Sequence, residues 1–131
     1  MKYLVDTSVL IHSLISKPKL SQRAFALLAS ESSDLYLSAV SSWEITIKVG
    51  VGKLVLPESP KTFVSRAMSL MAMRPLDITH AHAQTLGELP NVHRDPFDRM
   101  LIAQARTEGL VLLTADRIFR KYDVEQEYCG L

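Results

Sequence analysis

Short apolar runs alternate along this chain with longer segments of helical character, and this alternation limits the folds open to it. We predict strands at four such runs: Tyr3–Val5, Leu35–Leu37, Leu76–Ile78 and Leu110–Leu113. A further edge strand is expected near Val124. Short continuous runs of this kind suit strands that are buried on both faces. Strands separated by helices form a parallel sheet covered on both sides, so the sequence predicts an α/β fold.

The segments between the strands carry apolar residues at helical spacing, together with capping signals. We predict helices over Val9–Ile15, Ser21–Ala29, Ser38–Lys48, Lys61–Met73, Thr79–Leu89, Asp95–Gly109 and Asp116–Tyr122. The clearest start is Asp95-Pro96, because aspartate is a favoured N-cap and proline fits the first helical turn. Gly109 is expected to close that helix.

Composition excludes several classes of protein. With 131 residues, 47% of them hydrophobic, we expect one globular domain over residues 1–131. The single cysteine, Cys129, allows neither a disulfide framework nor a cysteine zinc site. Fifteen basic and 14 acidic residues leave a net charge of +1, so any contact with nucleic acid would be local. With no signal-peptide pattern and no membrane-spanning run, we expect a soluble, cytoplasmic protein.

Acidic residues occur where strands end and where helices begin. Asp6 follows the first strand, Asp116 follows the last convincing one, Asp95 and Asp98 open a helix, and Glu44 lies two turns into another. Ligands of an open parallel sheet bind outside the carboxyl ends of its strands. Up to five carboxylates could therefore lie together along this edge of the sheet, which we call the rim. Two unit charges ~4 Å apart repel by about 4 kcal/mol at an effective dielectric near 20. Such a cluster either takes up protons or binds a cation.

The chemistry of these donors favours a hard divalent cation. Oxygen ligands without a thiolate suit Mg²⁺ or Mn²⁺. Mg²⁺ takes one or two carboxylates and keeps several waters, which suits the hydrolysis of a phosphodiester.

Most of the acids also have a simpler structural interpretation. Asp95 is a natural N-cap, and Asp98 at the third helical position suits the helix dipole. Glu44 fits a capping box with Ser41 or an i, i+4 pair with Lys48. Asp116 can cap the final helix. Asp6 has no evident capping role, and it is the acid that points most directly to function.

Four segments in a fixed order and spacing carry a family resemblance. They are Tyr3-Leu4-Val5-Asp6-Thr7-Ser8, then Ser41-Ser42-Trp43-Glu44-Ile45 with Lys48 and Gly52-Lys53-Leu54, then His93-Arg94-Asp95-Pro96-Phe97-Asp98-Arg99 with Ile102-Ala103-Gln104-Ala105, and finally Leu113-Thr114-Ala115-Asp116. Over nearly its whole length the chain resembles PIN-domain proteins, specifically toxin ribonucleases of the VapC type. The resemblance implies a PIN-like three-layer α/β/α fold with a short parallel sheet flanked by helices.

The resemblance also implies an activity and a site. The acids expected to hold Mg²⁺ or Mn²⁺ and activate water to cut RNA are Asp6, Glu44, Asp98 and Asp116. Residues expected beside the metal, as hydrogen-bonding support or as a further acid, are Thr7, Ser8, Asp95 and Thr114. Toxins of this family usually form homodimers and are silenced by a small cognate antitoxin.

Basic residues near the rim are candidates for contact with RNA. They are His93, Arg94, Arg99 and Arg117. A short basic run can equally be a solvated helix face. Phe63, Met68, Met71 and Met73 form an apolar stripe that we interpret as core or dimer interface, or as a groove for an antitoxin helix.

Two other functions remain open at this point. One is a PIN-fold module that binds RNA or protein without cutting, which the intact acids argue against. The other is phosphoryl transfer through an aspartyl-phosphate at Asp6; sites of that kind usually carry a second acid two residues on, where this chain has Ser8.

Overall fold

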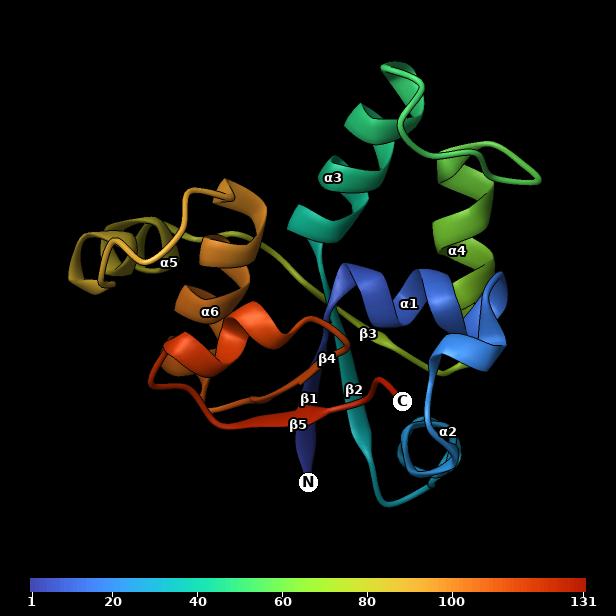
Figure 1. The fold of residues 1–131 in the computed structure, drawn as a ribbon, viewed down its shortest axis with the longest axis horizontal. Helices are drawn as coiled ribbons and strands as arrows, with labels where there is room; N and C mark the ends of the chain where they lie inside the picture. Colours follow the sequence, from blue (N-terminus) through green and yellow to red (C-terminus); the bar gives the residue numbers. More distant parts are fainter.

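The computed structural model describes residues 1–131 and contains a five-stranded, fully parallel sheet with helices on both faces (Figure 1). The strands are β1 (Lys2–Val5), β2 (Asp34–Ser38), β3 (Arg74–Leu76), β4 (Val111–Thr114) and β5 (Gln126–Tyr128). Their order in the sheet is β3-β2-β1-β4-β5, which puts the first strand at the centre. The predicted α/β fold with a short parallel sheet is confirmed.

Six α-helices and three short 3₁₀ segments connect the strands. The helices are α1 (Thr7–Leu14), α2 (Gln22–Ala29), α3 (Ala39–Gly50), α4 (Pro60–Leu70), α5 (His80–Thr85) and α6 (Pro96–Glu108), and the 3₁₀ segments are η1 (Lys17–Lys19), η2 (Leu86–Glu88) and η3 (Arg117–Lys121). In Figure 1, α1, α2 and α4 lie on one side of the sheet and α5 and α6 on the other, while α3 projects beyond the carboxyl ends of the strands. The longest helix has 13 residues, and none has the length and apolar character that a membrane crossing requires.

Side chains that alternate along the strands fill two separate cores. Tyr3 and Val5 face a core shared with α1, α2 and α4, whereas Leu4 faces a second core built mainly from α6. Leu113 and Leu112 divide between the two cores in the same way. This period of two is what a strand buried on both faces requires, and it gives the three-layer α/β/α arrangement.

Polar caps start the acid-bearing helices at the carboxyl edge of the sheet. The Ser38 hydroxyl accepts a hydrogen bond from the Val40 N–H (3.0 Å) at the start of α3. The Asp95 carboxylate accepts hydrogen bonds from the N–H groups of Phe97 and Asp98 at the start of α6. Both predicted caps are confirmed. They set the residue at which each helix begins, and therefore the position of Glu44 on α3 and of Asp98 on α6.

Two predicted strands lie elsewhere along the chain. The third strand was expected at Leu76–Ile78 but runs over Arg74–Leu76, and it contains Pro75. Proline is tolerated there because β3 is an edge strand with one side unpaired. The last strand forms at Gln126–Tyr128 rather than around Val124, because its partners on β4 are Leu112–Thr114.

Three helices also differ from their predicted bounds. The helix predicted to end at Met73 ends at Leu70, and Ala72 then adopts a positive φ of 49° that no helix accommodates. The helix predicted over 79–89 breaks into α5 and η2. The first helix begins at Thr7, directly after Asp6, rather than at Val9.

Gly109 ends α6 in a left-handed conformation. A substitution there tests how much this conformation contributes to the stability of the protein. Its φ is +67°, and a Cβ at this position would meet no atom within 4 Å, so strain would come from the backbone alone. We expect Gly109→Ala to lower the free energy of unfolding by roughly 1 kcal/mol in urea denaturation. Gly87→Ala is the matched control, because Gly87 has equal space and no positive φ. Equal stability of the two variants would contradict this account.

Candidate functional site

The carboxyl edge of the sheet gathers acidic side chains from four elements. Asp6 stands at the end of β1, Glu44 projects from α3, Asp98 lies in the first turn of α6, and Asp116 follows β4. The pKa of Asp98 is raised first by burial and then by the charges of Asp6, Asp95, Glu44 and Asp116. The fold therefore brings the other four predicted acids within electrostatic reach of Asp98.

Asp6 is a buried carboxylate held by two hydroxyl groups. The Ser8 and Thr114 hydroxyls donate to Asp6 Oδ2 over 2.7 and 2.8 Å. Burial raises the pKa of Asp6 to about 6, although these two hydrogen bonds act in the opposite direction. Asp6 occupies the N-cap position of α1, but its side chain caps no N–H of the helix. Its carboxylate lies within electrostatic reach of Glu44 and Asp98.

Glu44 is also buried, and only one of its two carboxylate oxygens has a partner. Lys48, one turn further along α3, donates to Glu44 Oε2, which confirms the predicted i, i+4 pair. Glu44 Oε1 is buried and makes no hydrogen bond. A buried polar atom without a partner is costly, so this oxygen is available to a ligand.

The proposed capping box between Ser41 and Glu44 is wrong. Helix α3 begins at Ala39, under the Ser38 cap, so Ser41 already lies inside the first turn. The Ser41 hydroxyl is hydrogen-bonded to Thr7 Oγ1 (2.8 Å) in the buried contact between α3 and α1. The Thr7 hydroxyl therefore joins two helices and bonds to none of the acids, whereas a backbone hydrogen bond from Thr7 is among the contacts that lower the pKa of Asp6.

Lys48 places a positively charged side chain beside these acids. Burial alone lowers the pKa of Lys48, but the hydrogen bond and charge of Glu44, with the charges of Asp95 and Asp98, together raise it. One ammonium faces several carboxylates, so the rim keeps an excess of negative charge.

Asp98 has a strongly raised pKa, first because it is buried and then because of that negative charge. Its pKa is raised to about 8, well above the ordinary 3.8. A carboxylic acid at this position therefore holds a proton near neutral pH unless a cation replaces it. His93 lies against it, with Nε2 3.3 Å from Asp98 Oδ2.

Asp95 and Asp116 each use one oxygen as a helix cap. Asp95 Oδ1 accepts two N–H groups of α6, and Asp116 Oδ1 accepts the Ile118 N–H (2.9 Å) of η3. In both residues Oδ2 makes no hydrogen bond. The structural and functional interpretations of these acids are thus compatible.

The basic candidates fall into two groups. Arg94 and Arg117 are exposed, and the Arg117 guanidinium lies 5.2 Å from the centre of the Tyr128 ring. Arg99 instead donates through Nη1 to the carbonyl oxygens of Pro90 and His93 and to the Tyr122 hydroxyl, so this nitrogen is engaged within the protein.

Tyr122 is a contributor that sequence reasoning missed. It is 4% exposed, and its hydroxyl lies 2.6 Å from His93 Nδ1. The two residues are 29 positions apart, and nothing in the spacing of the chain links them. Only the packing of η3 against α6 brings them together.

The donor set fits a partly hydrated divalent cation. No group of three or more acidic, histidine or cysteine side chains lies close enough together to hold a metal ion in the arrangement seen. Mg²⁺ is bound through one or two carboxylates and several waters, so it does not need a closed cage of protein ligands. The hard oxygen donors and the unpartnered Glu44 Oε1 suit such an ion.

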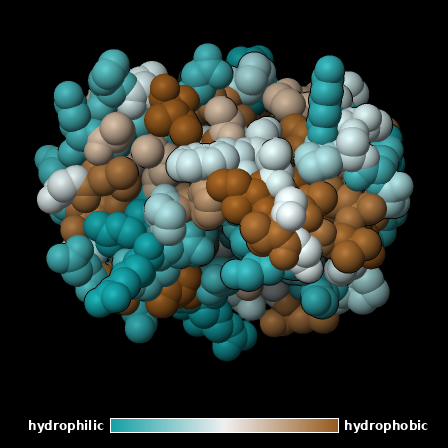
Figure 2. All heavy atoms as spheres, turned by 90° about the horizontal axis from the view of Figure 1, so that it is seen from above, coloured by the Kyte–Doolittle hydropathy of each residue, from teal (hydrophilic) through white to brown (hydrophobic).

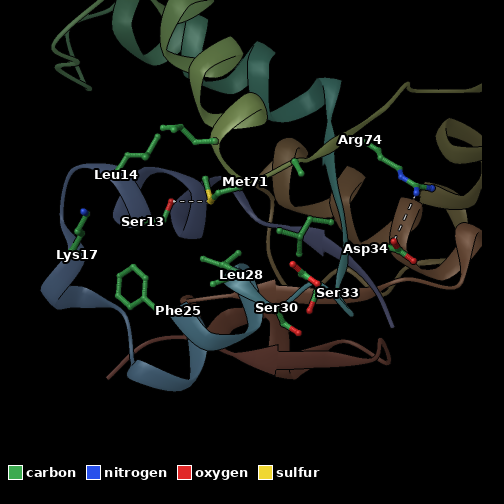
Figure 3. Close-up of a pocket in the computed structure, with 15 residues that line it drawn as sticks. Ser13, Leu14, Lys17, Phe25, Leu28, Ser30, Ser33, Asp34, Met71 and Arg74 are labelled. Atoms are coloured by element: carbon green, nitrogen blue, oxygen red, sulfur yellow. Dashed lines mark hydrogen bonds and ion pairs between the residues drawn. The ribbon is translucent and has the colours of Figure 1, made fainter.

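A cavity of about 720 Å³ lies away from this rim (Figure 3). It is formed between α1, α2, the end of α4 and the start of β2, and Leu14, Phe25 and Met71 contribute apolar walls. Asp34, at its edge, opens β2 at the opposite end of the sheet from the acids. Of the predicted apolar stripe, Phe63 and Met73 are buried in the core.

Comparison with known proteins agrees with this geometry. The family model of the PIN domain matches residues 3–125. The chain belongs to the PIN-domain family. Ribonuclease VapC16 of Mycobacterium tuberculosis is 37% identical to this PIN domain over 57 residues, which is 44% of this chain and 40% of that protein. The match thus spans less than half of that relative.

Solved structures share the fold at low sequence identity. VapBC2 from Rickettsia felis, bound to a DNA fragment from its promoter, aligns with a TM-score of 0.76 and 18% identity over 99% of this chain and 100% of that chain. VapBC-5 from Mycobacterium tuberculosis, a member of the VapBC family of toxin–antitoxin systems, aligns with a TM-score of 0.59 and 19% identity over 99% and 98%. The expected PIN-like fold is confirmed.

The raised pKa values of Asp6 and Asp98 predict how stability changes with pH when no divalent cation is bound. Each folded carboxyl, at about 6 and about 8, binds its proton more tightly than the unfolded chain does. The stabilisation is complete below the unfolded pKa and is lost as pH rises through the folded pKa. In a chelator, the melting temperature should therefore fall as pH rises from about 4 to about 8.

Two substitutions locate the source of this slope. Asp98→Asn removes the group with the higher pKa and should flatten the upper part of the curve. Asp123→Asn is the matched control, because Asp123 is exposed and should keep the wild-type slope. Identical slopes in all three proteins, measured by thermal denaturation, would contradict the electrostatic picture of the rim.

Proposed function

We propose that residues 1–131 act as a single-domain endoribonuclease that depends on Mg²⁺ or Mn²⁺ and hydrolyses RNA phosphodiester bonds in the cytoplasm. The observation that carries the proposal is the rim itself, where buried carboxylates face one another and Glu44 Oε1 has no partner. The names of the relatives given above support the same activity.

The acids of the rim would hold the cation. They are Asp6, Glu44, Asp98 and Asp116. When bound, the cation supplies Lewis-acid polarisation of the phosphate and lowers the pKa of water. Ser8 and Thr114 orient Asp6 through the hydrogen bonds to its Oδ2. Asp95 fixes the start of α6 and thereby the position of Asp98.

Exposed basic side chains would receive the RNA backbone. Arg94 stands beside the start of α6, and Arg117 follows Asp116 directly, so both flank the acids. Positive charge at the edges of an acidic site offsets the repulsion that a polyanion would meet there. Lys48 contributes by neutralising part of the charge of Glu44.

We propose a cognate antitoxin as protein partner, as the VapBC assemblies named above suggest. The cavity between α1, α2 and α4 offers an apolar surface for it. Lys17 at the cavity and the Arg74–Asp34 pair at its edge (3.8 Å) add charge around the apolar walls (Figure 3). An amphipathic helix with apolar residues on one face would suit this surface.

We also propose a homodimer, supported by an apolar stripe on α3. Trp43, Ile47 and Val51 are spaced by four residues and are 53%, 41% and 63% exposed. Residues at this spacing share one helix face. Figure 2 looks down on the end of the molecule from which α3 projects, and hydrophobic side chains gather there beside hydrophilic ones.

The proposed activity is tested with RNA and defined metal. Purified protein should cleave single-stranded RNA with Mg²⁺ or Mn²⁺ and not with a chelator. Asp6→Asn and Asp98→Asn should each lower the rate by at least about 100-fold, because each removes a metal ligand. Asp123→Asn should cleave at the wild-type rate. Cleavage that persists in both site variants would overturn the proposal, and tight RNA binding without metal-dependent cleavage would favour a binding module.

The dimer is tested by mass in solution. Light scattering should give twice the 14.7 kDa of one chain, and Ile47→Glu should return the protein to a single chain because it places a charge in the stripe. Ile15→Glu is the control, because Ile15 is 42% exposed but lies at the end of α1. A wild-type protein that is monomeric would contradict the proposed homodimer. A dimer that Ile47→Glu does not affect would show that the stripe on α3 is not its interface.

A further inference from the structure

Three side chains that the proposed chemistry does not use form a hydrogen-bonded chain ending on Asp98. Arg99 Nη1 lies 3.0 Å from the Tyr122 hydroxyl, which lies 2.6 Å from His93 Nδ1. His93 Nε2 is 3.3 Å from Asp98 Oδ2. Tyr122 is buried, and the side chains of His93 and Asp98 are only 16% and 15% exposed, so water competes little along this chain.

The direction of every hydrogen bond in this chain follows from its first member. A guanidinium has only donors, so Arg99 must donate to the oxygen of Tyr122. The hydroxyl proton of Tyr122 then has one acceptor within reach, His93 Nδ1. A neutral imidazole that accepts at Nδ1 carries its proton at Nε2. His93 is therefore set to donate to Asp98 Oδ2.

This arrangement engages one oxygen of Asp98 and leaves the other free. Oδ2 is the acceptor for His93, whereas Oδ1 makes no hydrogen bond within the protein. Asp6 shows the same division, since both of its hydroxyl donors bond to Oδ2. In each residue a fixed donor orients the carboxylate.

We propose that Arg99, Tyr122 and His93 are positioning residues that hold Asp98 in the orientation needed to bind the divalent cation. The proposal rests on the proposed function, because it assigns a role toward that cation. Outer partners of metal ligands fix ligand orientation, and their loss typically costs 10–100-fold in metal affinity. In this proposal His93 and Arg99 orient Asp98 and do not contact RNA.

The other contacts of Arg99 fit this role. Its Nη1 also donates to the carbonyl oxygens of Pro90 (2.8 Å) and His93 (3.4 Å). These bonds tie the segment before α6 to the helix that carries Asp98. The backbone of His93 is thereby fixed together with its ring.

The test is a titration with Mn²⁺ alone, followed by calorimetry, on the wild type and Tyr122→Phe. Phenylalanine keeps the ring and removes only the hydroxyl that donates to His93 Nδ1 and determines the tautomer of the imidazole. We expect the Kd for Mn²⁺ to rise roughly tenfold. RNA cleavage by Tyr122→Phe should fall at low Mn²⁺ and recover at saturating Mn²⁺, with the KM for RNA unchanged. Tyr36→Phe is the matched control, because the Tyr36 hydroxyl makes no hydrogen bond, and it should behave as the wild type.

A double-mutant cycle separates positioning from general loss of structure. If Tyr122 acts through His93, Tyr122→Phe should add almost nothing to the loss of Mn²⁺ affinity caused by His93→Ala. His93→Gln, whose amide can still donate to Asp98, should retain more affinity than His93→Ala. Additive losses, or an unchanged Kd in Tyr122→Phe, would overturn this inference alone. A wild-type protein that binds no Mn²⁺ and cleaves no RNA would overturn the proposed function as well.

Discussion

Carboxylates that are buried close to one another at the carboxyl edge of the sheet carry an energetic cost that the surrounding elements have to offset. Burial is the largest cause of the raised pKa values of Asp6 and Asp98, and the negative charges of neighbouring carboxylates add to it. A small protein tolerates such a cluster only where rigid elements hold each acid in place. Two hydroxyl groups hold Asp6, an ammonium balances Glu44, and an imidazole supports Asp98.

The sheet supplies the rigidity. β1 lies at its centre, and the Asp6 N–H continues the ladder by donating to the carbonyl oxygen of Leu113 (2.9 Å). Leu4 and Val5 are fully buried on opposite faces of the same strand. Asp6 therefore cannot shift without disturbing both cores. A site of this kind has low tolerance for repacking, because close-packed interiors transmit displacement.

The two ends of the sheet offer surfaces of different chemistry. The carboxyl end is acidic and bordered by exposed arginines, whereas the other end opens into a cavity with both apolar and polar walls. Chemistry and protein recognition can thus occupy separate surfaces of one small chain. A partner bound at the cavity would contact α1, and α1 begins immediately after Asp6, so the two ends share a helix.

Much of the fold and the site could be predicted from the sequence because the relevant signals are local. The alternation of apolar runs determined the parallel sheet, and the Asp95-Pro96 and Ser38 signals determined where α6 and α3 begin. Asp6 was identified because an acid that ends a buried strand has few other roles. Errors occurred where tertiary contacts outweighed local preference, as at β3, whose edge position admits Pro75.

The contacts between distant residues were decided by the tertiary structure alone. Thr7 was expected beside the metal, and the structure shows in addition that its hydroxyl bonds to Ser41, 34 residues away. Tyr122 had no sequence signal, and Arg99 looked like a free basic side chain. Periodicity reports which face of an element is buried, but it carries no information on which side chain of another element meets that face. Local sequence signals were enough to identify the acids and the sheet edge they share, whereas the support of Asp98 comes from a contact between His93 and Tyr122, 29 positions apart, that no local signal encodes.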